Sequence, residues 1–419
     1  MSGERVPART VLRLAAPALP VLAAEPLYLL VDTAVVGRLG AVPLAGLAVA
    51  GVVFAQVTTQ LNFLSYGTTA RAARLHGAGR RSAAVVEGVQ ATWLALAVGL
   101  LVLVVGQLAA RPVVGLLGDG GAVAGAAESW LRVALLGAPM ILVTLAGNGW
   151  MRGVQDTVRP MRYVLAGNGL SAMLCPTLVH GIGGWPGWGL VGSAWANVAG
   201  QSVAAALFLT ALRRERAGAP SGDPVPLRPR WALLRGQLVL GRDLLARSLA
   251  FQVCFLSATA VAARFGAAAV AAHQVVLQLW LFMALVLDAI AIAAQALVGA
   301  ALGGAARDGG VARARGLARQ VAGYGLGLGI AFGALFAALI GVLPGVFTTD
   351  AAVLAAIPVA WWFFVAMQPV AGVVFALDGV LLGAGDAAFL RTSTLAAAAL
   401  GFLPLNWASL GFGWGLGGI

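Results

Sequence analysis

Residues 269–300 read AVAAHQVVLQLWLFMALVLDAIAIAAQALVGA, and Asp288 is the only charged residue among them. A helix needs about 20 consecutive, mostly apolar residues to cross the hydrocarbon core of a bilayer. The whole 419-residue chain shares this character, because 60% of its residues are hydrophobic and 10% are charged. A soluble domain carries about 25% charged residues. The composition therefore predicts an all-α integral membrane protein and argues against a soluble enzyme.

The same criterion predicts a chain of membrane spans in two halves. Besides 269–300, we expect spans at residues 12–36, 44–68, 84–108, 123–149, 161–181, 188–212, 243–263, 316–343, 352–378 and 390–410. A twelfth begins at Trp414 and stops at Ile419, so we expect the twelfth helix to be truncated. The polar, proline-rich residues 213–242 predict a cytoplasmic linker. It separates an N-terminal six-helix bundle, 1–212, from a C-terminal bundle, 243–419, with helices 7–11 and the start of helix 12.

The basic residues predict the topology. All 27 are arginine, and the net charge is +12. Arg247 falls inside a span, four belong to one side (Arg38, Arg111, Arg132, Arg264), and the other 22 belong to the opposite side. Because basic residues collect in cytoplasmic loops, this predicts a multi-pass protein of the bacterial inner (plasma) membrane with a cytoplasmic N-terminus. No arginine cluster is interleaved with base-stacking aromatics, so nucleic acid is not an expected partner.

The two halves resemble each other in sequence. Residues 35–49 read VVGRLGAVPLAGLAV, and residues 261–275, at an offset of 226, read VAARFGAAAVAAHQV. The pattern GxxxGxxD occurs at 149–156 and again at 379–386, at an offset of 230. Each half has six spans, so corresponding helices run in the same direction. This predicts two bundles related by a pseudo-two-fold axis along the membrane normal, as in transporters built from parallel repeats.

Carboxylates inside the first half are candidates for function. A charged side chain at the bilayer centre costs roughly 2.5–3.5 kcal/mol, so it persists only when it is paired, hydrated or functional. Asp32 follows Tyr28 by four residues and Glu25 by seven, which places all three on one helix face. Pro17 lies in the same span and permits a kink. We interpret Asp32 as a protonation switch supported by these residues; the alternative is a structural ion pair.

The second half holds a separate group of charges. Arg247 is the lone arginine of its span, and Asp288 and Asp378 are its available partners. A structural salt bridge is the first interpretation, and a charge relay or substrate anchor is the second. Gln56 and Asn62 on the second span either line a cavity or join helices by hydrogen bonds. The scattered histidines and two cysteines lack metal-ligand spacing, so we expect neither a metal, a cofactor nor an enzymatic activity.

Several of these segments resemble the multidrug and toxic compound extrusion (MATE) family, in its DinF-like branch. They are EPLYLLVDTAVVGRLGAVPLAGLAVAG (25–51), RGVQDTVRP (152–160), VAARFGAAAVAAHQV (261–275), LDAIAIAAQALVG (287–299) and ALDGVLLGAGD (376–386). The resemblance implies two six-helix bundles around a central cleft. It also implies a monomeric antiporter that exports lipophilic, often cationic organic compounds, driven by inward flow of protons or sodium.

The resemblance also implies roles for single residues. Asp32 matches the family's coupling aspartate, Pro17 the proline at which the first helix bends, and Tyr28 a tyrosine one turn before the aspartate. Relatives with a sodium site in the first half have an Asn and, four residues later, an Asp on helix 5. This sequence has Ser171 and Cys175 at those positions.

The departure at helix 5 favours protons as the coupling ion. A thiol in place of a carboxylate weakens a sodium site, because sodium prefers hard oxygen ligands. Asn197 stands where helix 6 often has Thr, and Asn168 is a further candidate for the same cavity. Sodium coupling stays open as an alternative. So does a flippase for lipid-linked precursors, although such a flippase needs a larger basic cleft than the single arginine inside a span provides.

Overall fold

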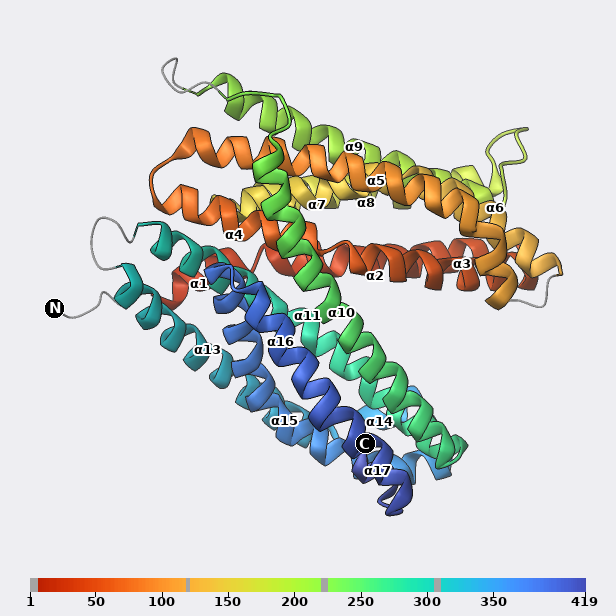
Figure 1. Ribbon diagram of the computed structural model, residues 1–419. Coiled ribbons are helices and arrows are strands. Elements are labelled where there is room, and N and C mark those ends of the chain that lie inside the picture. The colour runs from red at the N-terminus through yellow and green to blue at the C-terminus, as the bar shows by residue number, and fades with distance from the viewer. Residues whose placement is uncertain (1–6, 118–120, 220–224, 305–309) are drawn as a thin grey trace. The chain divides into compact units, whose positions relative to one another are not determined.

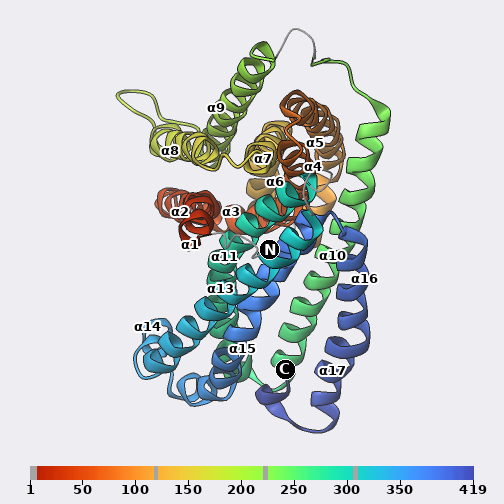
Figure 2. The ribbon, with the colours of Figure 1, turned by 90° about the vertical axis from the view of Figure 1, so that its left-hand side faces the viewer.

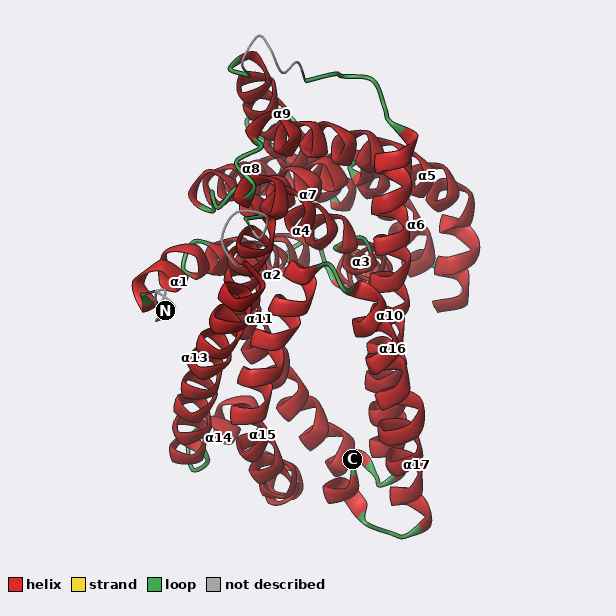
Figure 3. Ribbon diagram, turned by 60° about the vertical axis from the view of Figure 1, so that its left-hand side comes forward, coloured by secondary structure: helices red, strands yellow, loops and turns green. Residues whose placement is uncertain are grey.

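The computed structural model describes residues 7–117, 121–219, 225–304 and 310–419. Within these residues every regular element is helical (Figure 3), apart from an isolated β-bridge between Ile182 and Trp185. Nine of the described helices are long and apolar enough to cross a bilayer, and a bent helix pair brings the number to ten. The chain is therefore an all-α, multi-pass membrane protein, which confirms the predicted fold class.

One compact unit comprises Ala16–Gly241. Its helices, in the warm colours of Figure 1, are α2 (Ala18–Gly37), α3 (Ala41–Gln60), α4 (Phe63–Gly77), α5 (Arg81–Leu117), α6 (Ala122–Leu136), α7 (Ala138–Gly153), α8 (Val158–His180) and α9 (Leu190–Ala217). Within it α8 packs on α9 and α2, α3 packs on α6, and α7 packs on α4, α5 and α9. The site residues of the first half therefore lie among α2, α8 and α9.

The other unit combines the N-terminal helix α1 (Ala8–Ala15) with Arg242–Ile419. Its further helices, seen in Figure 2, are α10 (Trp231–Arg264), α11 (Ala267–Gly303), α13 (Gly310–Leu339), α14 (Leu343–Phe347), α15 (Ala351–Ala384), α16 (Ala387–Ala396), the π-helix η1 (Ala397–Phe402), α17 (Leu403–Gly411) and the 3₁₀ turn η2 (Gly415–Gly418). The helix α15 packs on both α11 and α13, and α1 packs on α11.

Three predicted spans are interrupted helices. The first is divided at Ala16 and Pro17 into α1 and α2. The second is divided at Leu61 and Asn62 into α3 and α4. The fourth is the bent pair α6 and α7, which meet at Gly137 at an angle of 46°. Proline restricts the backbone and removes an amide donor, which accounts for the break at Pro17.

The helix α8 covers the predicted span 161–181 with 23 residues. This helix is long enough to cross a bilayer, but its most apolar stretch is less apolar than those of the spanning helices counted above. The reason is its polar content, because Arg162, Asn168 and Ser171 occur within a single span. This helix carries Asn168, Ser171 and Cys175 of the candidate site.

The linker predicted at residues 213–242 is mostly helical, since α9 continues to Ala217 and α10 begins at Trp231; residues 220–224 lie outside the described part. The connection just before α10 is held against α5. The Gln90 amide donates to the Arg228 carbonyl at 3.0 Å and accepts from the Arg230 amide at 2.7 Å. Trp93 Nε1 donates to the Leu227 carbonyl at 2.7 Å.

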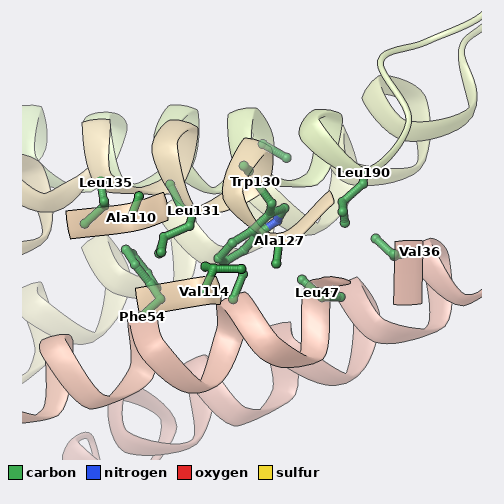
Figure 4. Close-up of a cluster of buried hydrophobic side chains, with 14 of the residues drawn as sticks. Val36, Leu47, Phe54, Ala110, Val114, Ala127, Trp130, Leu131, Leu135 and Leu190 are labelled. Carbon is green, nitrogen blue, oxygen red and sulfur yellow. The ribbon is translucent and has the colours of Figure 1, made fainter. Parts of the chain in front are cut away.

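The core of the first unit includes a cluster of buried apolar side chains between α3, α5 and α6. Phe54, Val114, Trp130 and Leu131 belong to it (Figure 4). The Phe54 and Trp130 rings meet edge to face, with 5.8 Å between centroids. Aromatic pairs of this geometry contribute about 0.5–1.5 kcal/mol beyond their buried area. The cluster fixes the position of Trp130, whose indole nitrogen reaches the candidate site.

The internal repeat recurs in the helix contacts. A Cβ added at Gly149 on α7 would collide with the backbone oxygen of Ser65 on α4. A Cβ at Gly379 on α15 would collide in the same way with the oxygen of Ala291 on α11. Ser65 and Ala291 are 226 residues apart, which is the offset found in the sequence. The GxxxGxxD pattern therefore marks the same close helix crossing in both units.

The turn after each of these glycine pairs is also repeated. Gln155 has φ = 63° and Gly385, its counterpart at the offset of 230, has φ = 69°. The next residues, Asp156 and Asp386, each accept a hydrogen bond at 3.1 Å from the backbone amide three residues further on. A left-handed backbone costs glycine nothing and costs Gln155 conformational energy, so the turn geometry is kept even where the residue is unfavourable.

Candidate functional site

Two residues of α2 form the centre of the candidate site. Asp32 and Tyr28 are buried, at 1% and 4% exposed, one helical turn apart. Glu25, which the sequence places on the same face, is exposed. Pro17 stands at the start of α2, directly after the break that separates it from α1. The structure thus brings Asp32 and Tyr28 together and leaves Glu25 outside the buried pair.

Neutral donors surround the Asp32 carboxylate. Cys175 Sγ on α8 donates to Asp32 Oδ1 at 3.4 Å, and the Ser193 hydroxyl on α9 lies beside the same carboxylate. Ser193 accepts a hydrogen bond from Trp130 Nε1 at 2.8 Å, and its backbone oxygen accepts one from the Tyr28 hydroxyl at 3.4 Å. The buried carboxylate is therefore surrounded by hydrogen-bond donors that carry no charge.

Several buried oxygens at this site have no hydrogen-bond partner among the described residues. They are Asp32 Oδ2, Asn168 Oδ1, Ser171 Oγ and Asn197 Oδ1. Buried polar groups normally have partners, because leaving one unsatisfied costs free energy. Such oxygens are able to accept a hydrogen bond or to bind a small cation, and the Asp32 carboxylate is also able to take up a proton.

The spacing of three polar residues explains how α8 contributes side chains to the candidate site. Asn168, Ser171 and Cys175 are spaced by three and four residues, so they share one helix face. The helix α9 approaches this face closely, because a Cβ at Gly200 would collide with the Gly167 backbone oxygen and with the Ser171 hydroxyl. A glycine at position 200 therefore allows Asn197 and Ser193 on α9 to reach the site.

The two candidates from the second span lie apart from these contacts. Gln56 is exposed on α3, and Asn62 is half-buried at the start of α4. Conversely, sequence reasoning missed Ser193 and Trp130. Neither carries a charge or forms a motif, and the only available signal was that Ser193 precedes Asn197 by four residues on the same helix face.

The second unit holds the charges predicted there. Arg247 Nη2 on α10 lies 2.6 Å from Asp378 Oδ1 on α15, and both side chains are largely buried. Asp288 lies half-buried on α11. The salt bridge opens onto a cavity of about 880 Å³ within this unit. Among the described residues no group of three or more His, Cys, Asp or Glu side chains could hold a metal ion.

A buried carboxylate on an interrupted spanning helix, within repeated helix bundles, is typical of a secondary membrane transporter. A family model described as MatE matches residues 17–177 and 244–408. The chain therefore belongs to the multidrug and toxic compound extrusion (MATE) family, as its sequence segments suggested.

Curated relatives support this assignment. The chain is 32% identical over 394 residues to Protein DETOXIFICATION 44, chloroplastic, from Arabidopsis thaliana, covering 90% of this chain and 72% of the relative. It is 33% identical over 270 residues to DNA damage-inducible protein F of Escherichia coli, covering 63% and 57%. The DinF protein, which the sequence segments resemble, is therefore among the relatives of this chain.

Solved structures share the fold. A MOP superfamily transporter from Pyrococcus furiosus superposes with a TM-score of 0.83 at 21% identity, covering all of this chain and 93% of the other. A MATE structure in the bent conformation gives a TM-score of 0.85 at 21% identity, covering 98% and 90%. These superpositions show that the chain shares its fold with solved MATE structures.

Proposed function

We propose that this chain exports lipophilic, often cationic organic compounds in exchange for protons that bind at Asp32. The observation that carries the proposal is the environment of this carboxylate. It is 1% exposed, its Oδ1 accepts a hydrogen bond from the Cys175 thiol, and its Oδ2 has no partner among the described residues. A single carboxylate without a cationic partner is neutralised by a single proton, which removes its desolvation cost.

The cycle follows from this change of charge. With the proton released, Asp32 is charged and the transporter holds a lipophilic substrate. Proton binding neutralises Asp32, and α2 then reorients at the break beside Pro17 and expels the substrate. Tyr28 and Asn197, which lie beside each other, are further polar groups near Asp32. Relative movement of the two bundles resets the transporter.

Sodium coupling is the alternative with a specific observation in its favour. The unpartnered oxygens of Asn168, Ser171 and Asn197 are hard ligands of the kind that sodium prefers. Against it stands Cys175, because a thiol is a poor sodium ligand where a second carboxylate would be a good one. We therefore rank proton coupling first.

The proposed setting is the inner membrane of a bacterium, with the chain as a monomer and its N-terminus in the cytoplasm. The excess of arginine on one side of the spans supports this orientation. A flippase for lipid-linked precursors is less well supported. Arg247, which the sequence places inside a span, is already paired with Asp378.

Drug-dependent proton flux in proteoliposomes tests the proposal, with Asp32→Asn as the variant. We expect Asp32→Asn to lose coupled export, at least tenfold below wild type, while it still folds and inserts, because the amide has a similar shape and cannot titrate. Glu25→Gln is the matched control, since Glu25 is exposed on the same helix. Wild-type export by Asp32→Asn, or export by the wild type on a sodium gradient alone, would contradict it.

A further inference from the structure

The second unit contains a cavity that the proposed coupling site does not use. Its volume is about 880 Å³, and its walls come from α10, α11, α15, α16, η1 and η2. Aromatic side chains such as Phe251, Trp280 and Phe363 line it. Ligand sites for drug-sized molecules have volumes of about 300–1,000 Å³ and are mostly apolar with a few polar groups that fix orientation. The cavity meets this description.

Arg247 is the principal polar group in the wall. Its Nη2 binds Asp378 Oδ1 at 2.6 Å, and its guanidinium carbon lies 5.1 Å from the centre of the Phe251 ring. Its Nε, although shielded from solvent, has no hydrogen-bond partner among the described residues. A guanidinium has five N–H donors in a rigid fork, so Arg247 is able to bind a second carboxylate beside Asp378.

His273 supplies another unsatisfied group to the same cavity. Its Nε2 is buried and also lacks a partner in the described part of the chain. In the tautomer with hydrogen on Nε2, this nitrogen is a donor. Among the described residues the cavity therefore combines apolar walls with two donor positions that lack a partner, while the Asp378 carboxylate in its wall is already engaged by Arg247.

We propose that this cavity binds an amphipathic organic anion, whose carboxylate contacts Arg247 while its apolar part packs against the aromatic wall. Asp378 is the counter-ion of Arg247 in the structure, and the ligand carboxylate shares or takes over that role. A lipophilic cation would have to displace Arg247 from Asp378 and would then face an unpaired guanidinium, which the low dielectric makes costly. Charge complementarity therefore favours the anion.

Three probes that share an anthracene ring and differ in charge separate the effect of charge on binding from the effect of hydrophobicity. We would titrate purified protein in lipid nanodiscs with 9-anthracenecarboxylate, neutral 9-anthracenemethanol and cationic 9-(aminomethyl)anthracene, and follow anthracene fluorescence. The carboxylate is expected to bind wild type more tightly than the alcohol, by on the order of tenfold, because it adds a charge-assisted hydrogen bond. The amine is expected to bind no better than the alcohol.

Two variants assign the preference to the salt bridge. In Arg247→Gln the carboxylate loses its advantage over the alcohol, and the amine gains one because Asp378 is left unpaired. In Asp378→Asn the carboxylate binds more tightly than in wild type, because Arg247 has lost its counter-ion. Arg264→Gln is the matched control, since Arg264 is exposed on the same helix and outside the cavity; it leaves all three affinities unchanged.

The proposal is overturned if wild type binds the carboxylate and the alcohol equally. It is also overturned if the amine binds best and Asp378→Asn abolishes that binding, which would make the cavity a cation site. Should Arg247→Gln fail to fold, Asp378→Asn alone decides, because weaker or unchanged carboxylate binding contradicts the proposal. No ion gradient is involved, so the outcome does not depend on proton coupling at Asp32.

Discussion

At the scale of single residues, the site around Asp32 is defined by the neutrality of its neighbours. Cys175 donates to the carboxylate, Ser193 lies beside it, and Trp130 holds the Ser193 hydroxyl at 2.8 Å. A site with one carboxylate and neutral partners changes by one unit of charge when it takes up one proton. A second carboxylate would instead favour a bound metal cation, so the proposed proton coupling depends on the thiol at position 175.

We predict that Cys175→Asp creates a sodium-responsive protein. With two carboxylates and the oxygens of Asn168 and Ser171, the site would offer hard ligands. Sodium should then raise the melting temperature of the variant in NaCl relative to KCl at equal ionic strength, because a ligand that binds only the folded state stabilises it. Cys175→Asn, similar in size and uncharged, should show no such difference. An equal sodium response in wild type would refute the interpretation of position 175.

The residues of this site could be predicted from sequence only where they are unusual for a membrane. Asp32 stands out because a charge inside a span is costly, and Tyr28 follows from helical spacing. Ser193 and Trp130 are ordinary membrane residues, and their place in the site arises from the packing of α6 on α9 and of α9 on α2. The spacing of seven residues places Glu25 on the same helix face as Asp32. Spacing alone does not show which part of that face the neighbouring helices cover, and Glu25 lies on the uncovered part.

At the scale of helices, close crossings depend on glycine. In the second unit α15 contacts α11 at Gly379, where no room remains for a side chain, and in the first unit α7 contacts α4 at Gly149 in the same way. Association of membrane helices depends on such close packing, because lipid provides no hydrophobic driving force. The repeated GxxxGxxD sequence predicted a relation between the halves, and the crossings supply its physical basis.

We predict that Gly379→Ala lowers stability by about 1–3 kcal/mol, the usual cost of overpacking. Gly149→Ala should do the same, because its new methyl group also meets a backbone oxygen. Gly327→Ala is the control, since a Cβ there meets nothing within 4 Å; it should be neutral or stabilising by up to about 1 kcal/mol. Melting curves in detergent measure this, and equal effects at Gly379 and Gly327 would exclude the packing explanation.

Sequence predicted the positions of the helices well and their interruptions poorly. All eleven predicted spans correspond to helices, but those at 12–36, 44–68 and 123–149 are each broken. Hydropathy averages over a window and is insensitive to a one- or two-residue break. Proline marks the break at Pro17, whereas no proline stands at Leu61 and Asn62.

At the scale of the whole molecule, the chain crosses from one compact unit to the other at two points, and the backbone is helical at one of them and interrupted at the other. At residues 241 and 242 the crossing lies inside the continuous helix α10, and at residues 15 and 16 it coincides with the break between α1 and α2. The helix α1 packs on α11, while α2 carries Asp32 and packs on α8. The break at Ala16 and Pro17 therefore interrupts the helix between the part that packs on α11 and the part that carries Asp32.

We predict that Pro17→Ala slows transport severalfold while leaving substrate affinity unchanged. Alanine restores the backbone amide and favours a continuous helix through the break, which stiffens the connection. Turnover in proteoliposomes and ligand affinity in detergent measure the two effects separately. Pro344→Ala, at the start of α14 and inside one unit, is the control. Unchanged turnover in Pro17→Ala would show that this break does not limit the cycle.

The positions of the two cysteines have a practical consequence. Cys175 is fully buried beside Asp32, whereas Cys254 lines the cavity of the other unit. A membrane-permeant maleimide should therefore distinguish them without any engineered residue. Cys254 reports through its alkylation rate whether the cavity is occupied, and Cys175 becomes reactive only when α2 and α8 separate. The natural sequence thus carries one chemical reporter in each half.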